Sequence, residues 1–248
     1  MLMSVAVLSG VLMAQTLSAS RNDGPIQQKV MNLLQSKSEF EKVDSSVEDG
    51  IVTLTGTVDV YQKKLDVEKK VRKTKDVKGV RNLVEVAGMS VSDQQLQAEL
   101  NKKLVYERVG YRDNAFSYYT LGVKDGVVTV GGETYNDVAR DAALSEVRHM
   151  AGVKDVIDNI KVLPVSINDD HIRMRTARAI YRDPVLSRYA TDPARPIKII
   201  VDNGHVTLYG TVENTMDKQV AGMRANGVFG AFSVQNNLIV QSDRNARM

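Results

Sequence analysis

Residues 47–58 read VEDGIVTLTGTV, and the same pattern returns as VKDGVVTVGGET at 123–134 and as VDNGHVTLYGTV at 201–212. In each copy an Asp-Gly or Asn-Gly pair separates two runs of alternating apolar residues. Such a pair favours a two-residue hairpin turn, because both central residues of a type I′ turn need a positive φ. The three stretches therefore predict three β-hairpins of one kind.

A second match follows each hairpin: VRNLVEV at 80–86, VIDNIKV at 156–162 and VQNNLIV at 234–240. The offset between copies is 76 and then 78 residues, and it is constant from the beginning to the end of the match. Between the two matches, positions such as Val67, Val71 and Thr74 recur at helical spacing. A strand–helix–strand connection of this length predicts that the two strands it joins run parallel.

A further helix is expected before each hairpin. Its start is predicted at Asp23-Gly24-Pro25 in the first copy, at a capping box of Ser92 with Gln95 in the second, and at Asn168 in the third. The predicted fold class is α+β, with three tandem helix–strand–strand–helix–strand modules, each a small three-stranded mixed sheet with two helices on one face. We place module 1 at 23–88, module 2 at 91–164, module 3 at 167–242 and a tail at 243–248. The linkers are short, so neighbouring modules are expected to dock on one another.

Six repeated glycines are expected to be structural. Three belong to the turns and three to an inward strand position, where a missing side chain would let a helix approach the sheet closely. The turn glycines are Gly50, Gly126 and Gly204, and the strand glycines are Gly56, Gly132 and Gly210.

The composition of the 248 residues, 43% hydrophobic and 25% charged, indicates a chain that folds around buried cores. The absence of cysteine excludes disulfides, thiolate nucleophiles, Cys-ligated zinc, iron–sulfur clusters and a lipid anchor through Cys. Three histidines without a repeated partner, no phosphate-binding glycine loop and no G-x-S-x-G motif argue against an enzyme, a cofactor or a metal site. The net charge of +3 is too small to indicate nucleic acid by itself.

The first twenty residues carry no charge, and Arg21 follows them. Their interrupted apolar run resembles the hydrophobic centre of a secretory signal, with small residues near a cut at 18–20. No Lys or Arg precedes this run, so either the true start lies upstream or the signal is atypical; a buried N-terminal helix is the alternative. We expect residues 1–22 to be a signal-like segment and the protein to be periplasmic or secreted.

The hairpin at 49–56 and the strand that closes its module resemble the BON module, named for an osmotically inducible periplasmic protein and nodulation proteins. The family pattern joins an apolar-DG-x-V-T-L-x-G hairpin to a V-x-N-x-apolar-x-V strand, and it returns at 125–132 and 203–210. The G-V-x-x-V approach to the last strand is clear only at 152–156. This resemblance, which covers nearly everything after residue 23, implies a non-enzymatic bacterial envelope protein that associates with phospholipid surfaces in osmotic or envelope stress. It implies scaffold positions and no site residues.

A basic helix is predicted at 62–81, with nine Lys or Arg residues and three acidic ones. Basic side chains near an anionic bilayer contribute about 1 kcal/mol each. We therefore take Lys69, Lys70, Arg72 and Lys73 as candidate membrane or partner contacts. The alternative is a solvated helix face with local ion pairs such as Asp66–Lys70.

Longer segments rich in Tyr and Arg precede the second and third hairpins, at 106–116 and 181–189. Tyrosine suits a lipid headgroup layer or a protein interface, because an apolar ring carries a wet hydroxyl. The same rings would equally well cover the core of a small module. The candidate contacts here are Tyr106, Tyr111, Arg112, Phe116, Arg182, Leu186, Arg188 and Tyr189.

Together these features predict an exported protein that binds anionic phospholipid peripherally. A periplasmic adaptor between envelope proteins, or a holdase chaperone, is the alternative, and a soluble ion-sensing role is a third. Nucleic acid is not an expected partner, because the basic helix lacks interleaved aromatics and export removes the protein from nucleic acid.

Overall fold

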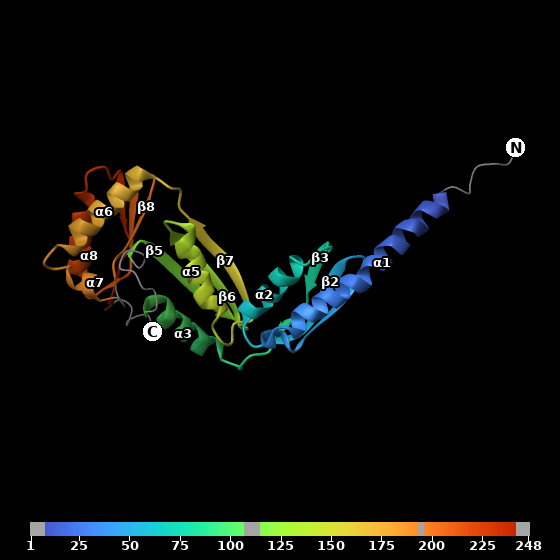
Figure 1. The fold of residues 1–248 in the computed structure, drawn as a ribbon. Helices are drawn as coiled ribbons and strands as arrows, with labels where there is room; N and C mark the ends of the chain where they lie inside the picture. The colour runs from blue at the N-terminus through green and yellow to red at the C-terminus, as the bar shows by residue number, and fades with distance from the viewer. Residues whose placement is uncertain (1–7, 107–114, 193–195, 242–248) are drawn as a thin grey trace. The chain divides into compact units, whose positions relative to one another are not determined.

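The computed structural model describes residues 8–106, 115–192 and 196–241, without the side chains of residues 8–21, 105 and 106 (Figure 1). The chain divides into two compact units, residues 1–91 with 148–155 and residues 92–147 with 156–248. The predicted α+β class is confirmed, with three repeated modules of helix, hairpin, helix and final strand.

Module 1 has a three-stranded sheet whose third strand is interrupted. Its elements are α1 (Leu8–Gln35), the 3-10 helix η1 (Ser38–Phe40), β1 (Val43–Glu48), β2 (Ile51–Val58), α2 (Tyr61–Arg72), β3 (Gly79–Asn82) and β4 (Glu85–Val86). β1 runs antiparallel to β2, with Val47 opposite Val52. β3 and β4 both pair parallel with β2, as the crossover predicted. Val30 of α1 and Val67 of α2 lie in one core with Val52, so both helices cover the same face of the sheet.

Module 2 repeats this arrangement with an uninterrupted third strand. Its elements are α3 (Asp93–Tyr106), β5 (Ser117–Lys124), β6 (Val127–Thr134), α5 (Asp137–Arg148) and β7 (Asp155–Val162). The strand order is β5-β6-β7, with β6 in the middle as β2 is in module 1. Leu96 and Leu100 of α3 are buried, as are Ala143 and Val147 of α5, so each helix buries one stripe.

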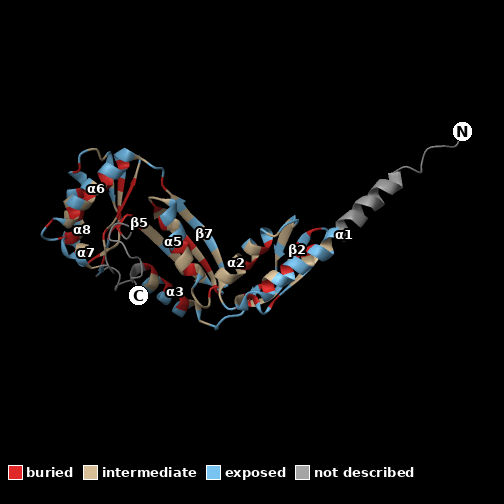
Figure 2. Cartoon of the chain, in the orientation of Figure 1, coloured by how far each residue is buried: buried red, intermediate tan, exposed pale blue. Residues whose placement is uncertain are grey.

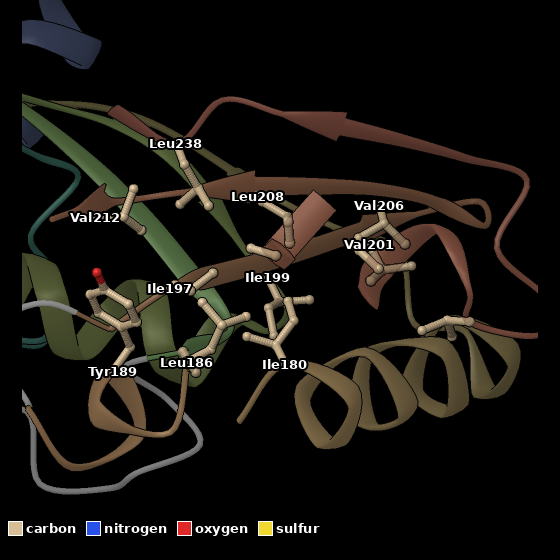
Figure 3. Close-up of a cluster of buried hydrophobic side chains, with 14 of the residues drawn as sticks. Ile180, Leu186, Tyr189, Ile197, Ile199, Val201, Val206, Leu208, Val212 and Leu238 are labelled. Carbon is tan, nitrogen blue, oxygen red and sulfur yellow. The ribbon is translucent and has the colours of Figure 1, made fainter. Parts of the chain in front are cut away.

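Module 3 adds a short helix between its leading helix and its hairpin. Its elements are α6 (Ile167–Tyr181), α7 (Arg188–Thr191), β8 (Lys198–Asp202), β9 (His205–Tyr209), β10 (Thr211–Val212), α8 (Thr215–Asn226), β11 (Ser233–Asn236) and β12 (Ile239–Val240). β8 pairs antiparallel with β9, while β11 and β12 run parallel to β9 and β10. The buried residues lie on the strands and on the sides of α6 and α8 turned toward them (Figure 2). Figure 3 shows the core they form.

The three hairpin turns have the backbone conformation that the Asp-Gly and Asn-Gly pairs predict. The first turn residue has a φ between 50° and 54° in every copy, and the glycine after it has a φ between 79° and 81°. Positive φ at both positions is the requirement of a type I′ turn. The prediction of three like hairpins is therefore confirmed.

An aspartate from each leading helix holds the turn of its own module, a contact that sequence comparison did not predict. Both carboxylate oxygens of this aspartate accept backbone N–H groups, one from each turn residue, at N···O distances of 2.7 to 3.0 Å. Asp23 binds Asp49 and Gly50, Asp93 binds Asp125 and Gly126, and Asp169 binds Asn203 and Gly204. Hydrogen bonds to an ionised acceptor are stronger than neutral ones, so this bidentate contact fixes the helix to the hairpin.

The strand glycines have a different role from the one predicted. Gly56, Gly132 and Gly210 have φ values of 101°, 110° and 126°, which favour glycine. A Cβ at Gly132 would lie 2.0 Å from the carbonyl oxygen of Tyr118, on the neighbouring strand. The expected close approach of a helix is wrong, because the missing side chain accommodates the backbone of the paired strand.

The third strand carries an amide or a carboxylate at one repeated position. Asn82 and Asn236 each donate to a backbone carbonyl of the preceding helix, at 2.8 and 2.7 Å. Asp158, at the matching position in module 2, instead pairs with the guanidinium of Arg140 on α5. The helix between the second and third strands is thus attached to the final strand by an amide-to-carbonyl hydrogen bond in modules 1 and 3, and by an ion pair in module 2.

Two predicted helix starts are wrong and one is confirmed. Ser92 caps α3 as expected, because its Oγ accepts the backbone N–H of Gln95 at 3.3 Å and donates to Gln95 Oε1 at 2.9 Å. The cap of α6 is Ser166, whose Oγ accepts from the backbone N–H of Asp169, so Asn168 is already inside the helix. α1 begins at Leu8 and continues through Pro25, because the preceding Leu, Met, Ala and Gln residues favour helix.

The predicted tail lies wholly outside the described residues, and the predicted signal segment lies outside them in part. Residues 1–7 and 242–248 have no described structure, so the nature of the first 22 residues stays a prediction. Within the described part of the chain, no helix combines the length and hydropathy that crossing a bilayer requires.

Modules 2 and 3 pack against each other within one compact unit, as the short linker predicts. The Tyr118 and Tyr209 rings stack with centroids 4.0 Å apart, and Lys161 Nζ lies 2.8 Å from an Asp202 carboxylate oxygen. The buried guanidinium of Arg173, on α6, lies 5.9 Å from the ring centroid of Phe116. Rings and ion pairs therefore join the two modules.

Candidate functional site

The predicted basic helix corresponds to α2 and the residues after it, and its outer face is open to solvent. Val67 and Val71 point into the core of module 1, whereas Lys69 and Lys73 are exposed, as their helical positions predict. Lys75, just after the helix, is exposed as well. Among the described residues no acidic partner is seen for these three lysines. They form what we name the α2 cationic face: Lys69, Lys73 and Lys75.

Two of the other basic candidates have partners inside module 1. Lys70 Nζ lies 2.7 Å from a carboxylate oxygen of Glu39 and 4.7 Å from the ring centroid of Phe40. This hydrogen bond from Lys70 lowers the pKa of Glu39. Arg72 pairs with Glu68 one turn earlier on the helix. Both cations are therefore less available to an external anion than the α2 cationic face.

The alternative interpretation of the basic helix named an ion pair between Asp66 and Lys70, and this pairing is wrong. Asp66 accepts a hydrogen bond from the Gln62 side chain at 2.9 Å, while Lys70 reaches Glu39 on η1. Lys70 therefore links its helix to the neighbouring 3-10 helix.

Three of the predicted contact residues belong to the interior, and for these the prediction is wrong. Leu186 and Tyr189 are 0% and 2% exposed and lie among the core side chains of module 3 (Figure 3). Phe116, 6% exposed, belongs to the same core and lies edge-on to Tyr135, with the centroids 6.2 Å apart. A module of this size needs such rings to complete its core, so they cannot serve as a surface.

The other candidates of these segments divide into three groups. Arg188 pairs with Asp217 and Glu213, so its charge is used within module 3. Arg182 is exposed at the end of α6. The Tyr106 side chain and residues Tyr111 and Arg112 lie outside the described residues.

Tyr189 is the centre of a buried polar cluster. Its hydroxyl donates to Asp217 Oδ2 at 2.6 Å and accepts the backbone N–H of Glu213 at 2.8 Å. Arg188 pairs with the same carboxylate, and its guanidinium lies 5.2 Å from the Tyr189 ring centroid. Burial and the hydrogen bond to Asp217 raise the pKa of Tyr189. The cluster fixes α7 to the beginning of α8, and its role is structural.

We expect the stability of module 3 to fall at alkaline pH because of Tyr189. Its pKa is higher in the folded state, so the unfolded chain loses the phenolic proton first as the pH rises above about 10. The stabilisation that Tyr189 contributes is complete below its pKa in the unfolded chain and is lost as the pH rises through its pKa in the folded state. Thermal unfolding of Tyr189→Phe, followed by circular dichroism between pH 8 and 11, should show a lower melting temperature at pH 8 and a flatter alkaline decline. Tyr209→Phe is measured in parallel, because the pKa of Tyr209 is raised too and this tyrosine therefore contributes to the same alkaline decline. Equal alkaline slopes for Tyr189→Phe and the unmodified chain would contradict this assignment.

Sequence reasoning missed an apolar surface on module 3. Phe229 and Phe232 are 85% and 75% exposed in the loop between α8 and β11, and Met223 on α8 is 65% exposed. We name these three residues the α8 apolar face. The repeat contained a signal for this exposure. Met223, Phe229 and Phe232 occupy, in this order, the positions of Lys69, Lys75 and Lys78 in module 1, 154 residues earlier.

No metal-binding constellation is found in the described residues. Within 22–104, 115–192 and 196–241, no three His, Asp or Glu side chains come together in a way that could hold a metal ion. The repeated polar residues instead hold turns and strands. The molecule is thus built from three like α+β modules whose repeated positions are structural.

Comparison with known proteins agrees with this architecture. The BON domain model matches the chain three times, at residues 22–88, 92–164 and 168–242. The chain therefore belongs to the BON domain family, with three tandem copies. BON domains are in general non-catalytic and are associated with envelope and periplasmic proteins.

The other comparisons are distant. No curated protein matches the chain. Among solved structures, the C-terminal domain of CdsD, a structural protein of the type III secretion system of Chlamydia trachomatis, is 14% identical, with 85% of this chain and 94% of that chain covered and a TM-score of 0.25. The periplasmic domain of the type III secretion inner membrane protein PrgH from S. typhimurium is 12% identical, covering 86% and 98%, with a TM-score of 0.20.

Proposed function

We propose that this chain is a non-enzymatic protein of the bacterial envelope that associates peripherally with anionic phospholipid surfaces, in protection against osmotic or envelope stress. Membership of the BON domain family supports the envelope location and the absence of catalysis. The observation that carries the lipid proposal is the α2 cationic face, with three exposed lysines and no acidic partner for them among the described residues.

The magnitude of this attraction is sufficient for reversible binding. Each lysine near an anionic bilayer contributes about 1 kcal/mol, so three contribute about 3 kcal/mol, roughly a hundredfold in affinity. The attraction is screened within about 8 Å at physiological salt, so the binding should weaken as salt is added. Basic residues at a helix C-terminus also interact favourably with the helix dipole, by about 0.3 to 1 kcal/mol each, which is the structural alternative.

Charge reversal on α2 tests the proposal. We expect the Lys69→Glu/Lys73→Glu variant of the full chain to bind vesicles containing phosphatidylglycerol at least about 30-fold more weakly in a sedimentation assay. The matched control is Lys102→Glu/Lys124→Glu, which changes the net charge equally at two exposed lysines of module 2. An equal loss in both variants would show an effect of net charge alone, and unchanged binding of the α2 variant would overturn the proposed surface.

The adaptor or holdase function is the alternative outcome of the same assay. If the unmodified chain does not sediment with anionic vesicles at low salt, while defined envelope proteins are recovered with it, the phospholipid proposal is wrong and the adaptor function replaces it.

A further inference from the structure

Two of the three side chains of the α8 apolar face, Phe229 and Phe232, belong to a loop that is anchored although both rings face solvent. The backbone N–H of Phe232 donates to the carbonyl of Gly204 at 2.8 Å, and its ring lies over that turn glycine, where a Cβ would be 2.6 Å from ring atom Cδ2. The carbonyl of Phe229 accepts a hydrogen bond from Arg175 at 3.1 Å. The loop is thus anchored to the hairpin turn on one side and to α6 on the other, with both rings still exposed.

The same face of the module is cationic in module 1. Lys78 occupies the place of Phe232, because its backbone N–H donates to the Gly50 carbonyl at 2.9 Å and its side chain lies over Gly50. Met223 and Phe229 likewise correspond to Lys69 and Lys75 by the constant offset of the repeat. The same three positions of the repeated module therefore carry lysines in module 1 and apolar side chains in module 3.

Cations lie beside the apolar side chains. Arg175, Arg178 and Arg182 follow one another at helical spacings of three and four along α6 and its end, and all three are exposed. Arg175 lies over the Phe229 ring, with its guanidinium carbon 5.7 Å from the ring centroid. No acidic partner for these arginines is seen in the part of the chain that the structure describes. We name the three residues the α6 arginine row.

The acidic residues of α6 and α8 are engaged elsewhere. Asp169 holds the hairpin turn, Asp170 pairs with Arg173, and Asp217 binds Tyr189 and Arg188. α6 and α8 pack against each other (Figure 1), and the contact of Arg175 with the Phe229 ring places the row beside the apolar face on one side of module 3. That side combines exposed aromatic rings with unneutralised positive charge.

We propose that the α8 apolar face inserts into the headgroup and upper acyl region of an anionic phospholipid bilayer, while the α6 arginine row contacts lipid phosphates. This inference rests on the proposed function and names the part of module 3 that takes part in it. Aromatic side chains favour the membrane interface, and a neighbouring row of cations is attracted to anionic lipid. A second copy is a poorer occupant, because the acidic residues of α6 and α8 are engaged elsewhere and this side offers no carboxylate to pair with arginines buried in an interface.

The absence of tryptophan from the chain permits a direct test. Phe229→Trp and Phe232→Trp each place a single fluorophore on the apolar face of the full chain. On addition of vesicles of phosphatidylglycerol and phosphatidylcholine, we expect the emission of both to shift to the blue and to be quenched by lipids brominated in the upper acyl chain. Val165→Trp, in the linker at a residue 92% exposed, is the matched control and should show neither effect.

A binding measurement complements the fluorescence. We expect Phe229→Ser/Phe232→Ser to bind these vesicles at least about tenfold more weakly, and Val138→Ser/Val165→Ser, which removes two exposed valines, to bind as the unmodified chain does.

The outcomes separate this inference from the proposed function. Vesicle binding without a blue shift at either tryptophan overturns insertion and leaves the role of the α2 cationic face standing. No vesicle binding by the unmodified chain overturns both. A blue shift that grows with protein concentration in the absence of vesicles shows self-association through this face, and overturns the lipid inference.

Discussion

Replacement of Gly132 by alanine is expected to lower the free energy of unfolding of module 2 by about 3 kcal/mol or more. The alanine Cβ would lie 2.0 Å from the Tyr118 carbonyl oxygen, and the backbone φ of 110° is one that side chains rarely adopt. The paired strand must therefore move away, and the hydrogen bonds between β5 and β6 near this point are lost. Hydrogen exchange of the amides of these two strands measures the loss locally, which suits a chain of several modules.

Two further glycines provide the controls. Gly122 lies in β5 without a positive φ, and an added methyl group there would have no atom within 4 Å, so Gly122→Ala should change the stability by less than about 1 kcal/mol. Gly210→Ala should have an intermediate effect on module 3, because its Cβ would lie 2.9 Å from the nearest carbonyl oxygen. If the amides of β5 and β6 exchanged at the same rate in Gly132→Ala and in Gly122→Ala, the structural role assigned to the strand glycines would be wrong.

Replacement of Asp169 by asparagine is expected to destabilise module 3 by about 2 to 3 kcal/mol. Both carboxylate oxygens of Asp169 accept a backbone N–H of the hairpin turn, at 3.0 and 2.8 Å. The amide keeps one acceptor and turns a donor toward the second N–H, which is left without its partner beside a side chain that is only 4% exposed. Amide exchange at Asn203 and Gly204 should accelerate accordingly.

The repeat supplies a graded series for this second effect. Asp23 and Asp93 make the same bidentate contact but are only half-buried, so water can replace the lost acceptor. Their asparagine variants should lose about 1 kcal/mol each. Asp141→Asn, at an exposed position of α5, should be neutral within about 0.5 kcal/mol. Equal effects at Asp169 and Asp141 would show that the turn does not depend on the carboxylate.

The hairpins were predictable because their information is local. A turn such as Asp125-Gly126 is decided by the φ values of two adjacent residues, and the alternation around it decides which side chains are buried. The aspartate that holds this turn was not predictable in the same way. The separation from Asp23 to Asp49 is shorter than that from Asp93 to Asp125, because the intervening loops differ, and a comparison without gaps does not align the aspartates.

The surface residues were predictable only in part, for a reason of size. An exposed and a buried tyrosine look alike in sequence, and Tyr189 is buried because a small module lacks enough aliphatic side chains to close its core. Lys69 and Lys73 were easier to place, since a long charged side chain opposite a valine stripe has few alternatives to solvent. Phe232 was missed because apolar residues are assigned to cores by default, although its position matches an exposed lysine.

The central claim is that a repeated scaffold presents cations to anionic phospholipid. Co-sedimentation of the unmodified full chain with vesicles, with and without phosphatidylglycerol and over a range of salt, tests it most directly. We predict sedimentation with the anionic vesicles at low salt, a progressive loss as salt rises, and little sedimentation with vesicles of phosphatidylcholine alone. Equal sedimentation with both kinds of vesicle, or none with either at low salt, would contradict it.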